Sequence, residues 1–387
     1  MKSLRFLTLF AVAVVGVVPP IAAQTAEVWQ MQDSGTKAGM RGIDSVDGTK
    51  NGMVAWASGT GGTVLRTTDG GAHWQKCAVP DAATDGATLD FRGIQAWDAQ
   101  TAIVMASGPG DKSRLYKTED GCQTWKLVFK NPDKIGFWDA IRMWTPTEGF
   151  LAGDPETDSD SDRPKVEWPY LSEFTSWNGF VDDSVFLASV EARVGESSFA
   201  ASNTCLVLGP FRNKDGEARE AWLATGGPSG SRVLHYSHIL GGEPERQTSN
   251  EVELSMFPKT SSGGIFSLDL RSSMTFVAVG GDYTKPNDST GTAAWSSDGG
   301  EHWAAATKPP HGYRSAVQWS ESLKAWITVG ANGSDISRDD GRTWQPLDDG
   351  NWNALSLPFV VGPNGRIARL NAAAVSLTRA HHVSATP

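Results

Sequence analysis

The sequence predicts an all-β protein that folds as a single seven-bladed β-propeller. Three observations support this prediction. An eight-residue motif occurs four times along the chain, and a second, shorter signature occurs seven times. The 387 residues also combine 42 glycines with 16 tryptophans, a composition that fits many tight turns and a tryptophan in most repeated units. Motifs that recur along a chain in this way indicate a stack or ring of small structural units, which bury their apolar faces against their neighbours.

The eight-residue motif reads Ser/Thr-x-Asp-x-Gly-x-x-Trp. The short Asp side chain accepts hydrogen bonds from backbone N–H groups of a turn, Gly supplies a positive φ, and Trp buries a large ring between sheets. We therefore expect a structural role for the motif. Its residues are Asp69 and Trp74, Asp120 and Trp125, Asp298 and Trp303, and Asp339 and Trp344, with Cys122 in the Gly position of the second copy. The pattern resembles the Asp-box, or bacterial neuraminidase repeat, of propeller blades.

The second signature is a polar, a small and an apolar residue at the start of a strand. It is followed each time by an apolar strand that ends near Gly. The seven copies begin at Arg41, Arg92, Asp139, Phe199, Phe266, Arg314 and Asn353, and Phe replaces the polar residue in the fourth and fifth. The last unit stops after its third strand, at residues 366–370. We expect residues 28–31 to supply its missing strand and to close the ring, which would remove two exposed sheet edges.

The two ends of the chain are expected to lie outside the propeller. Lys2 and Arg5 precede an apolar run, residues 6–18, that is too short to span a membrane. Residues 1–23 are therefore predicted to be a cleaved signal peptide, so that the mature protein is secreted or periplasmic. The propeller is predicted to cover residues 24–370, with residues 371–387 as a disordered tail. No later stretch is apolar enough to predict a membrane span.

Charge and cysteine content exclude several classes of protein. The formal net charge is −10, which argues against nonspecific nucleic-acid binding. The chain has three cysteines, Cys77, Cys122 and Cys205, without metal-binding spacing, and an odd count leaves at least one thiol free. We expect no disulfide framework, no cofactor and a monomeric chain held together by its core.

Several strings over most of the mature chain resemble the photosystem II stability/assembly-factor-like propellers, a group with BNR or sortilin-type repeats. Examples are residues 56–62 (WASGTGG), 149–155 (GFLAGDP), 280–286 (GGDYTKP) and 312–316 (GYRSA). The resemblance implies a seven-bladed propeller that binds a protein or peptide partner and performs no catalysis. It also implies a patch of arginines near the central channel.

The first strand of each propeller blade lines the channel, so the seven signature residues are expected to ring one mouth. Arginine side chains there suit a carboxylate or phosphate, and the alternative is that they pair with Asp139, Asp44 or Asp282 and stabilise blade junctions. The long loops at 154–166 and 281–291 are expected to form the rim. The candidate ligand-binding residues are Arg41, Arg92, Asp139, Asp154, Asp282, Tyr283, Arg314 and Asn353.

Two further possibilities remain open at the level of sequence. Asp158, Asp160 and Asp162 alternate as calcium ligands do, although Arg163 occupies the position where an EF-hand needs Gly, so we predict no metal site there. Asp-boxes also occur in sialidases, so the alternative function is a glycan-active hydrolase that uses carboxylates at the channel mouth. The Arg-Ile-Pro string of sialidases is absent, and no Gly-x-Gly-x-x-Gly opens a helix after a strand.

Overall fold

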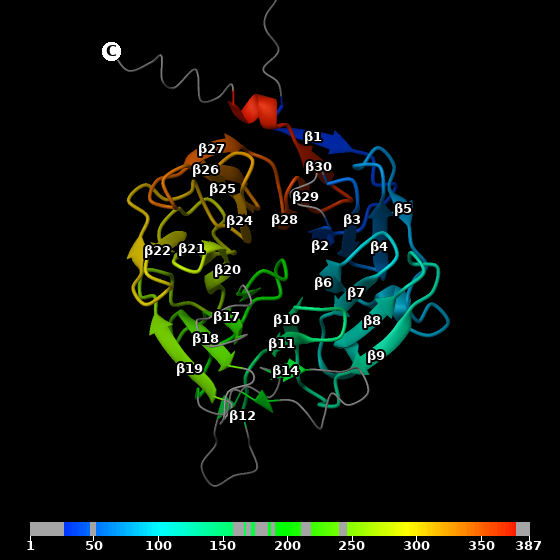
Figure 1. Ribbon diagram of the computed structural model, residues 1–387, viewed down its shortest axis with the longest axis horizontal. Coiled ribbons are helices and arrows are strands. Elements are labelled where there is room, and N and C mark those ends of the chain that lie inside the picture. The colour runs from blue at the N-terminus through cyan, green and yellow to red at the C-terminus, as the bar shows by residue number, and fades with distance from the viewer. Residues whose placement is uncertain are drawn as a thin grey trace, which may run out of the picture.

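The computed structural model describes residues 27–46, 52–157, 166–167, 172–174, 185–186, 190–209, 218–239 and 246–376. Within these ranges the chain forms 30 strands and two 3-10 helices, η1 (Gly86–Thr88) and η2 (Gly110–Lys112). Viewed along its shortest axis, the molecule is a ring of small sheets around a central axis (Figure 1). The prediction of an all-β propeller is confirmed.

Six four-stranded antiparallel sheets follow chain order. The first three are β2 (Met40–Ser45), β3 (Ala55–Gly59), β4 (Thr63–Thr67) and β5 (Gln75–Lys76); β6 (Phe91–Ala96), β7 (Ala102–Ala106), β8 (Arg114–Thr118) and β9 (Lys126–Lys130); and β10 (Trp138–Met143), β11 (Gly149–Gly153), β14 (Ser172–Phe174) and β15 (Val185–Phe186). The other three are β16 (Leu206–Leu208), β17 (Ala218–Ala224), β18 (Arg232–Ile239) and β19 (Arg246–Glu253); β20 (Gly263–Ser272), β21 (Thr275–Asp282), β22 (Ala293–Ser296) and β23 (Ala304–Ala305); and β24 (Ala316–Ser320), β25 (Ala325–Gly330), β26 (Gly333–Ser337) and β27 (Gln345–Asp348). β12 (Glu156–Thr157) and β13 (Val166–Glu167) form a separate two-stranded ribbon.

A further four-stranded sheet combines the two ends of the described chain. Its order is β1 (Trp29–Gln32), β30 (Ile367–Leu370), β29 (Phe359–Val361) and β28 (Ala354–Ser356). β1 pairs antiparallel with β30, from Trp29 opposite Leu370 to Gln32 opposite Ile367. Six sheets are therefore built from strands that follow one another along the chain, one fewer than the seven predicted blades. The composite sheet has four strands only because the N-terminal strand β1 joins it.

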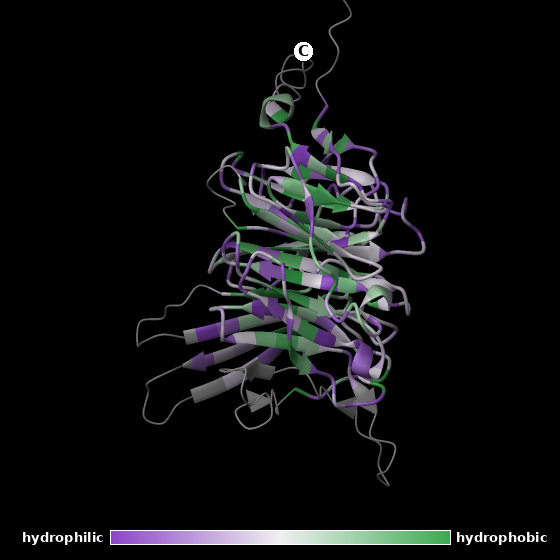
Figure 2. Cartoon of the chain, turned by 90° about the vertical axis from the view of Figure 1, so that its right-hand side faces the viewer, coloured by the Kyte–Doolittle hydropathy of each residue, from purple (hydrophilic) through white to green (hydrophobic). Residues whose placement is uncertain are grey.

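The core lies between neighbouring sheets, where the inner strands are buried on both faces. All five residues of β7 are fully buried, and every residue of β3, β11, β21 and β25 is also buried. Such strands read as continuous apolar or small-residue runs, because both faces lose water contact on folding. The outermost strands β5 and β23 are exposed along their length. In the side view, green hydrophobic stretches lie along the strands, whereas the connecting loops are mostly pale or purple (Figure 2).

The repeated eight-residue motif forms the turn after the third strand of four sheets. In the first copy, Asp69 Oδ1 accepts hydrogen bonds from Thr67 Oγ1 and from the His73 backbone N–H, both at 2.9 Å. Gly71 N in turn donates to Thr67 Oγ1 at 2.9 Å. The same three bonds recur around Asp120, Asp298 and Asp339. Each of these bonds joins residues at most four positions apart, so the turn is held by local contacts.

The sequence predicted no disulfide framework and at least one free thiol, and the structure contains one disulfide. Cys77 and Cys122 are joined, with their Cα atoms 5.2 Å apart. Ala78 N donates to Cys122 O at 3.2 Å, which brings the end of one sheet against the turn of the next. Since the partners lie 45 residues apart, their proximity depends on how the two sheets pack. Cys205 is free and buried.

Residues 372–376 form a helical turn within residues 371–387, which were predicted to be a disordered tail. Val375 is fully buried in the cluster that contains Trp29 and Trp352, and this packing holds the turn in place. The predicted signal peptide lies outside the described residues. Among the described residues, no helix has the length and apolar character needed to cross a membrane.

Candidate functional site

Four of the seven predicted mouth residues are the extra residue of a β-bulge. The register between the first and second strands shifts between Met40 and Gly42, and the bulged residue is Arg41. Equivalent shifts occur at Arg92, Asp139 and Phe266. A bulge turns one side chain away from the regular alternation of a strand. The bulges therefore give these four side chains a direction that strand periodicity alone would not predict.

Two bulged arginines supply the basic part of the mouth. Arg92 Nε lies 2.8 Å from Asp90 Oδ2, one terminal nitrogen donates to the Ala200 carbonyl at 3.3 Å, and the guanidinium lies 5.9 Å from the centre of the Phe137 ring. Arg41 is half-buried, and its Nε is buried without a hydrogen-bond partner in the described part of the chain. Burial raises the pKa of Tyr313, and the positive charge of Arg41 opposes that rise, which indicates that the two side chains are neighbours.

Four aromatic rings form a connected cluster around Phe266; the charge of Arg41 acts on Tyr313, and Arg92 bonds to the carbonyl of Ala200, the neighbour of Phe199. Phe199 stacks on Phe266 with their ring centres 3.9 Å apart, Tyr313 meets Phe266 edge-on at 4.8 Å, and Tyr283 does so at 6.2 Å. Tyr283 is 52% exposed, whereas Phe266 is buried. We call Arg41, Arg92, Phe199, Phe266, Tyr283 and Tyr313 the mouth cluster. From the sequence, the two phenylalanines are interpreted as loose copies of a polar signature, and Tyr313 is considered as a residue facing the channel but is not included among the candidate ligand-binding residues.

Asp139, which is buried, and Asp154, which is half-buried, form a pair of carboxyl groups next to the mouth cluster. Asp139 is 1% exposed and accepts a hydrogen bond from Ser198 Oγ at 2.7 Å. Burial and the neighbouring Asp154 hold the pKa of Asp139 well above its usual range. Burial also raises the pKa of Asp154 to about 6, and the two carboxyl groups hydrogen-bond to each other. At neutral pH we expect Asp139 to carry the shared proton and Asp154 the charge.

Arg314 does not reach the mouth surface. It is fully buried, where its Nε donates to Asp335 Oδ2 at 2.7 Å and a terminal nitrogen donates to Asn332 Oδ1 at 2.6 Å. Another terminal nitrogen lies 2.9 Å from His311 Nδ1. The alternative interpretation, in which arginines stabilise the blades, fits Arg314. Arg314 pairs with Asp335 of β26 in the same sheet. It does not pair with Asp139, Asp44 or Asp282, the partners considered from the sequence.

Asp282 and Asn353 also hold the scaffold together. Burial would raise the pKa of Asp282, but hydrogen bonds from Thr284, Ser262 and Thr260 outweigh this effect and lower it to about 2. Asn353 Nδ2 donates to the Met40 carbonyl at 2.7 Å, which joins the composite sheet to the β2–β5 sheet. Of the eight predicted ligand-binding residues, Tyr283 is exposed, Arg41, Arg92, Asp154 and Asn353 are half-buried, and Asp139, Asp282 and Arg314 are buried.

Among the described residues, one group of side chains has the spacing of possible metal ligands. The weak calcium candidate, Asp158 with Asp160 and Asp162, lies outside the described residues. Asp298, Glu301 and His302 have ligand atoms within 4.8 Å of one another. However, Asp298 already accepts hydrogen bonds from Ser296 Oγ and the His302 backbone, so this group belongs to a turn.

Comparisons with known proteins place the chain by its fold. No protein-family model matches the sequence, and no curated protein matches it either. The structure is similar to that of YCF48 bound to D1 peptide, with a TM-score of 0.56 and 15% identity over 90% of this chain and 98% of that one. It is also similar to YCF48 from Cyanidioschyzon merolae, with a TM-score of 0.57 and 15% identity over 89% and 99% of the two chains. The resemblance read from the sequence is confirmed at the level of fold: the chain is a β-propeller like that of YCF48, a photosystem II assembly factor.

Proposed function

We propose that the protein binds a segment of a protein or peptide partner at the mouth cluster, in the manner of an assembly factor. The observation that carries the proposal is the arrangement of two arginines beside four aromatic rings, with Arg41 Nε lacking a partner among the described residues. A guanidinium recognises a carboxylate by charge-assisted hydrogen bonds, and an exposed aromatic ring offers apolar contact area. The segment is therefore expected to carry both an acidic and an apolar side chain. The complex of YCF48 with D1 peptide supports a peptide as the kind of partner.

Fluorescence anisotropy tests this proposal with a fluorescein-labelled hexapeptide that contains Phe and Glu residues. We expect saturable binding to the mature protein. The double variant Arg41→Gln/Arg92→Gln is expected to weaken it about tenfold or more, because charge-assisted hydrogen bonds contribute about 1.5–3 kcal/mol each.

Arg271→Gln is the control, since the same substitution removes one positive charge from a surface ion pair with Asp340, away from the mouth cluster. Equal binding by the double variant and the control would contradict the proposal. A version of the peptide with Gln in place of Glu separates the acidic contact from the aromatic one.

The alternative function, a glycan-active hydrolase, has one observation in its favour. Asp139 and Asp154 are two carboxyl groups at the same mouth, and such pairs supply general acid and base in glycosidases. Against it, glycosidases hold their carboxyl groups roughly 5–9.5 Å apart, whereas these two are in direct contact and Asp139 is buried. We therefore favour binding. Hydrolysis of aryl glycosides or sialosides that is lost in Asp154→Asn would reverse this choice.

We also propose the finer features of the architecture and location. The composite sheet acts as a seventh blade, and β1 closes the ring through its pairing with β30. The four repeated turns act as structural Asp-boxes, which their shared hydrogen bonds support. The mature protein is a monomer exported to the periplasm or the medium. Mass spectrometry of the mature N-terminus tests export, with Gln24 as the expected first residue.

A further inference from the structure

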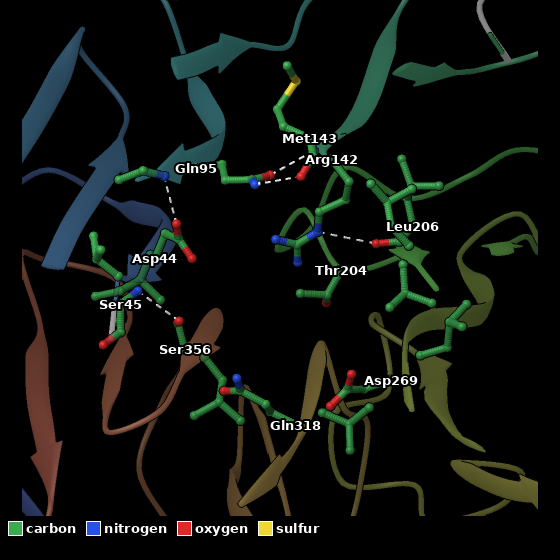
Figure 3. Close-up of a pocket in the computed structure, with 18 residues that line it drawn as sticks. Asp44, Ser45, Gln95, Arg142, Met143, Thr204, Leu206, Asp269, Gln318 and Ser356 are labelled. Atoms are coloured by element: carbon green, nitrogen blue, oxygen red, sulfur yellow. Dashed lines mark hydrogen bonds between the residues drawn. The ribbon is translucent and has the colours of Figure 1, made fainter. Parts of the chain in front are cut away.

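A second feature lies on the central axis, at the other end of the innermost strands. It is a cavity of about 380 Å³ lined by the later residues of those strands, and none of the mouth cluster lines it (Figure 3). Its charged side chains are Asp44 from β2, Arg142 from β10 and Asp269 from β20. Figure 3 shows all three turned toward the same space. The cavity is thus a separate candidate site, built from three different sheets.

The three charged groups are anchored by the backbone, and Arg142 attracts both carboxylates at longer range without forming a close ion pair with either. Asp44 Oδ2 accepts from the Ala96 N–H at 2.7 Å, and Asp269 Oδ2 accepts from the Trp319 N–H at 2.8 Å. Arg142 Nε donates to the Leu206 carbonyl at 3.3 Å. Among the described residues, no side chain donates a hydrogen bond to either carboxylate. Arg142 likewise has no ion pair within 4.0 Å in that part of the chain.

This arrangement is costly for the protein on its own. Burial raises the pKa of Asp44 and raises that of Asp269 to about 6, and it lowers the pKa of Arg142. All three side chains are half-buried, and charges that lose water contact are normally paired closely, because their desolvation is otherwise only partly compensated. Here each charged group keeps free hydrogen-bonding atoms that face a cavity of the size that takes small molecules. The unpaired charges therefore point to a charged ligand.

The walls of the cavity are rigid enough to hold such a ligand. Gln95 Nε2 donates to the Met143 carbonyl at 3.0 Å and Gln95 Oε1 accepts from the Met143 N–H at 2.9 Å, which ties β6 to β10. The Leu357 N–H donates to Gln318 Oε1 at 2.6 Å, which ties β24 to the end of β28. Together with the Ala96–Asp44 and Trp319–Asp269 bonds, which tie β6 to β2 and β24 to β20, they hold the strands around the cavity at fixed spacing, so the site is preorganised.

We propose that this cavity binds a small basic amino acid, with one carboxylate and two cationic groups. The carboxylate pairs with Arg142, and the two cationic groups pair with Asp44 and Asp269. One guanidinium and two carboxylates on the protein match this ligand charge for charge. A diamine would leave Arg142 unpaired and repelled, and a neutral amino acid would leave one carboxylate unpaired. The proposal does not depend on peptide binding at the mouth cluster.

Isothermal titration calorimetry of the mature protein with L-lysine tests the proposal. We expect one molecule bound per chain. Cadaverine, which lacks the carboxylate, and L-norleucine, which lacks the second ammonium group, are each expected to bind at least about tenfold more weakly. Equal affinity for cadaverine would overturn the proposal, and so would the absence of binding by L-lysine, L-ornithine and L-arginine alike.

Protein variants provide the second arm of the experiment. Asp44→Asn and Asp269→Asn keep an oxygen that accepts the Ala96 and Trp319 N–H bonds, so both variants are expected to fold, and their melting temperatures verify this. Each is expected to weaken L-lysine binding by at least about tenfold through the loss of one ion pair. Asp349→Asn, at a side chain that is 96% exposed, is the matched control and should bind as the unchanged protein does. Unchanged affinity in both cavity variants would overturn the proposal.

Discussion

The aspartates of the repeated turns and those near the central axis differ in where their partners come from. Asp69 of the first turn is satisfied by residues within four positions of chain, and the hydrogen bonds from His73 lower its pKa to about 2. Asp269 on the axis is held by a strand of the next sheet, and burial raises its pKa to about 6. A turn that is held by hydrogen bonds between nearby residues can form in every repeated unit. A site whose residues come from several sheets forms only once in the molecule.

Both regions depend on the same ring, so damage to the ring is expected to have the largest effect. Trp29 of β1 is 4% exposed, and its Nε1 donates to Ser334 Oγ at 2.9 Å. Deletion of residues 24–34 should lower the melting temperature by about 10 °C or more, and Trp29→Ala alone should cost about 3–5 kcal/mol. Met31→Ala, at a side chain that is 52% exposed on the same strand, is the control and should change stability little. A deletion variant that melts at the unchanged temperature would show that β1 is dispensable.

A turn aspartate is expected to affect stability without affecting binding at the mouth. Asp339 accepts from Ser337 Oγ, Thr343 N and Thr343 Oγ1 at 2.6–2.9 Å. Asp339→Ala should therefore destabilise the protein by about 1–3 kcal/mol, measured by urea unfolding. The hexapeptide should bind this variant as tightly as it binds the unchanged protein. Loss of binding in the folded variant would mean that the turns take part in recognition.

The axial aspartate is expected to have a smaller effect that depends on pH. Because the pKa of Asp269 is higher in the folded protein than its value of 3.8 in the unfolded chain, its ionisation costs stability as pH rises from about 4 to 6. Asp269→Asn removes this cost. The variant should be more stable than the unchanged protein by about 1–3 kcal/mol at pH 8, and the two should be nearly equal at pH 4. An equal difference at both pH values would mean that Asp269 does not titrate as described.

The sequence predicted the features that rest on local contacts. The Asp69 motif fixed the positions of four turns, and the apolar runs ending in Gly fixed the second strands, because both depend on residues close together in the chain. Arg41 and Arg92 were also located correctly at the starts of first strands. For these elements, spacing in sequence translates directly into position in the fold.

Features that rest on contacts between sheets were not predictable from the sequence. Arg314 resembles Arg41 in its signature, yet it is buried because Asp335 of its own sheet lies within reach. The aromatic contacts of Phe266 with Phe199 and Tyr313 join three sheets. Arg142 was not singled out, since no local pattern marks a residue whose neighbours Asp44 and Asp269 are far away in sequence.

The central claim is that recognition occurs at the mouth cluster and that the repeated turns serve the scaffold. Photo-crosslinking tests it most directly, with a benzophenone placed in the Phe- and Glu-containing hexapeptide and the attachment points read by mass spectrometry. We expect crosslinks on the peptides that contain Tyr283, Tyr313 and Arg41, and their loss in Arg41→Gln/Arg92→Gln. Crosslinks concentrated at the turns around Asp69, Asp120, Asp298 and Asp339, unchanged in the double variant, would contradict the account.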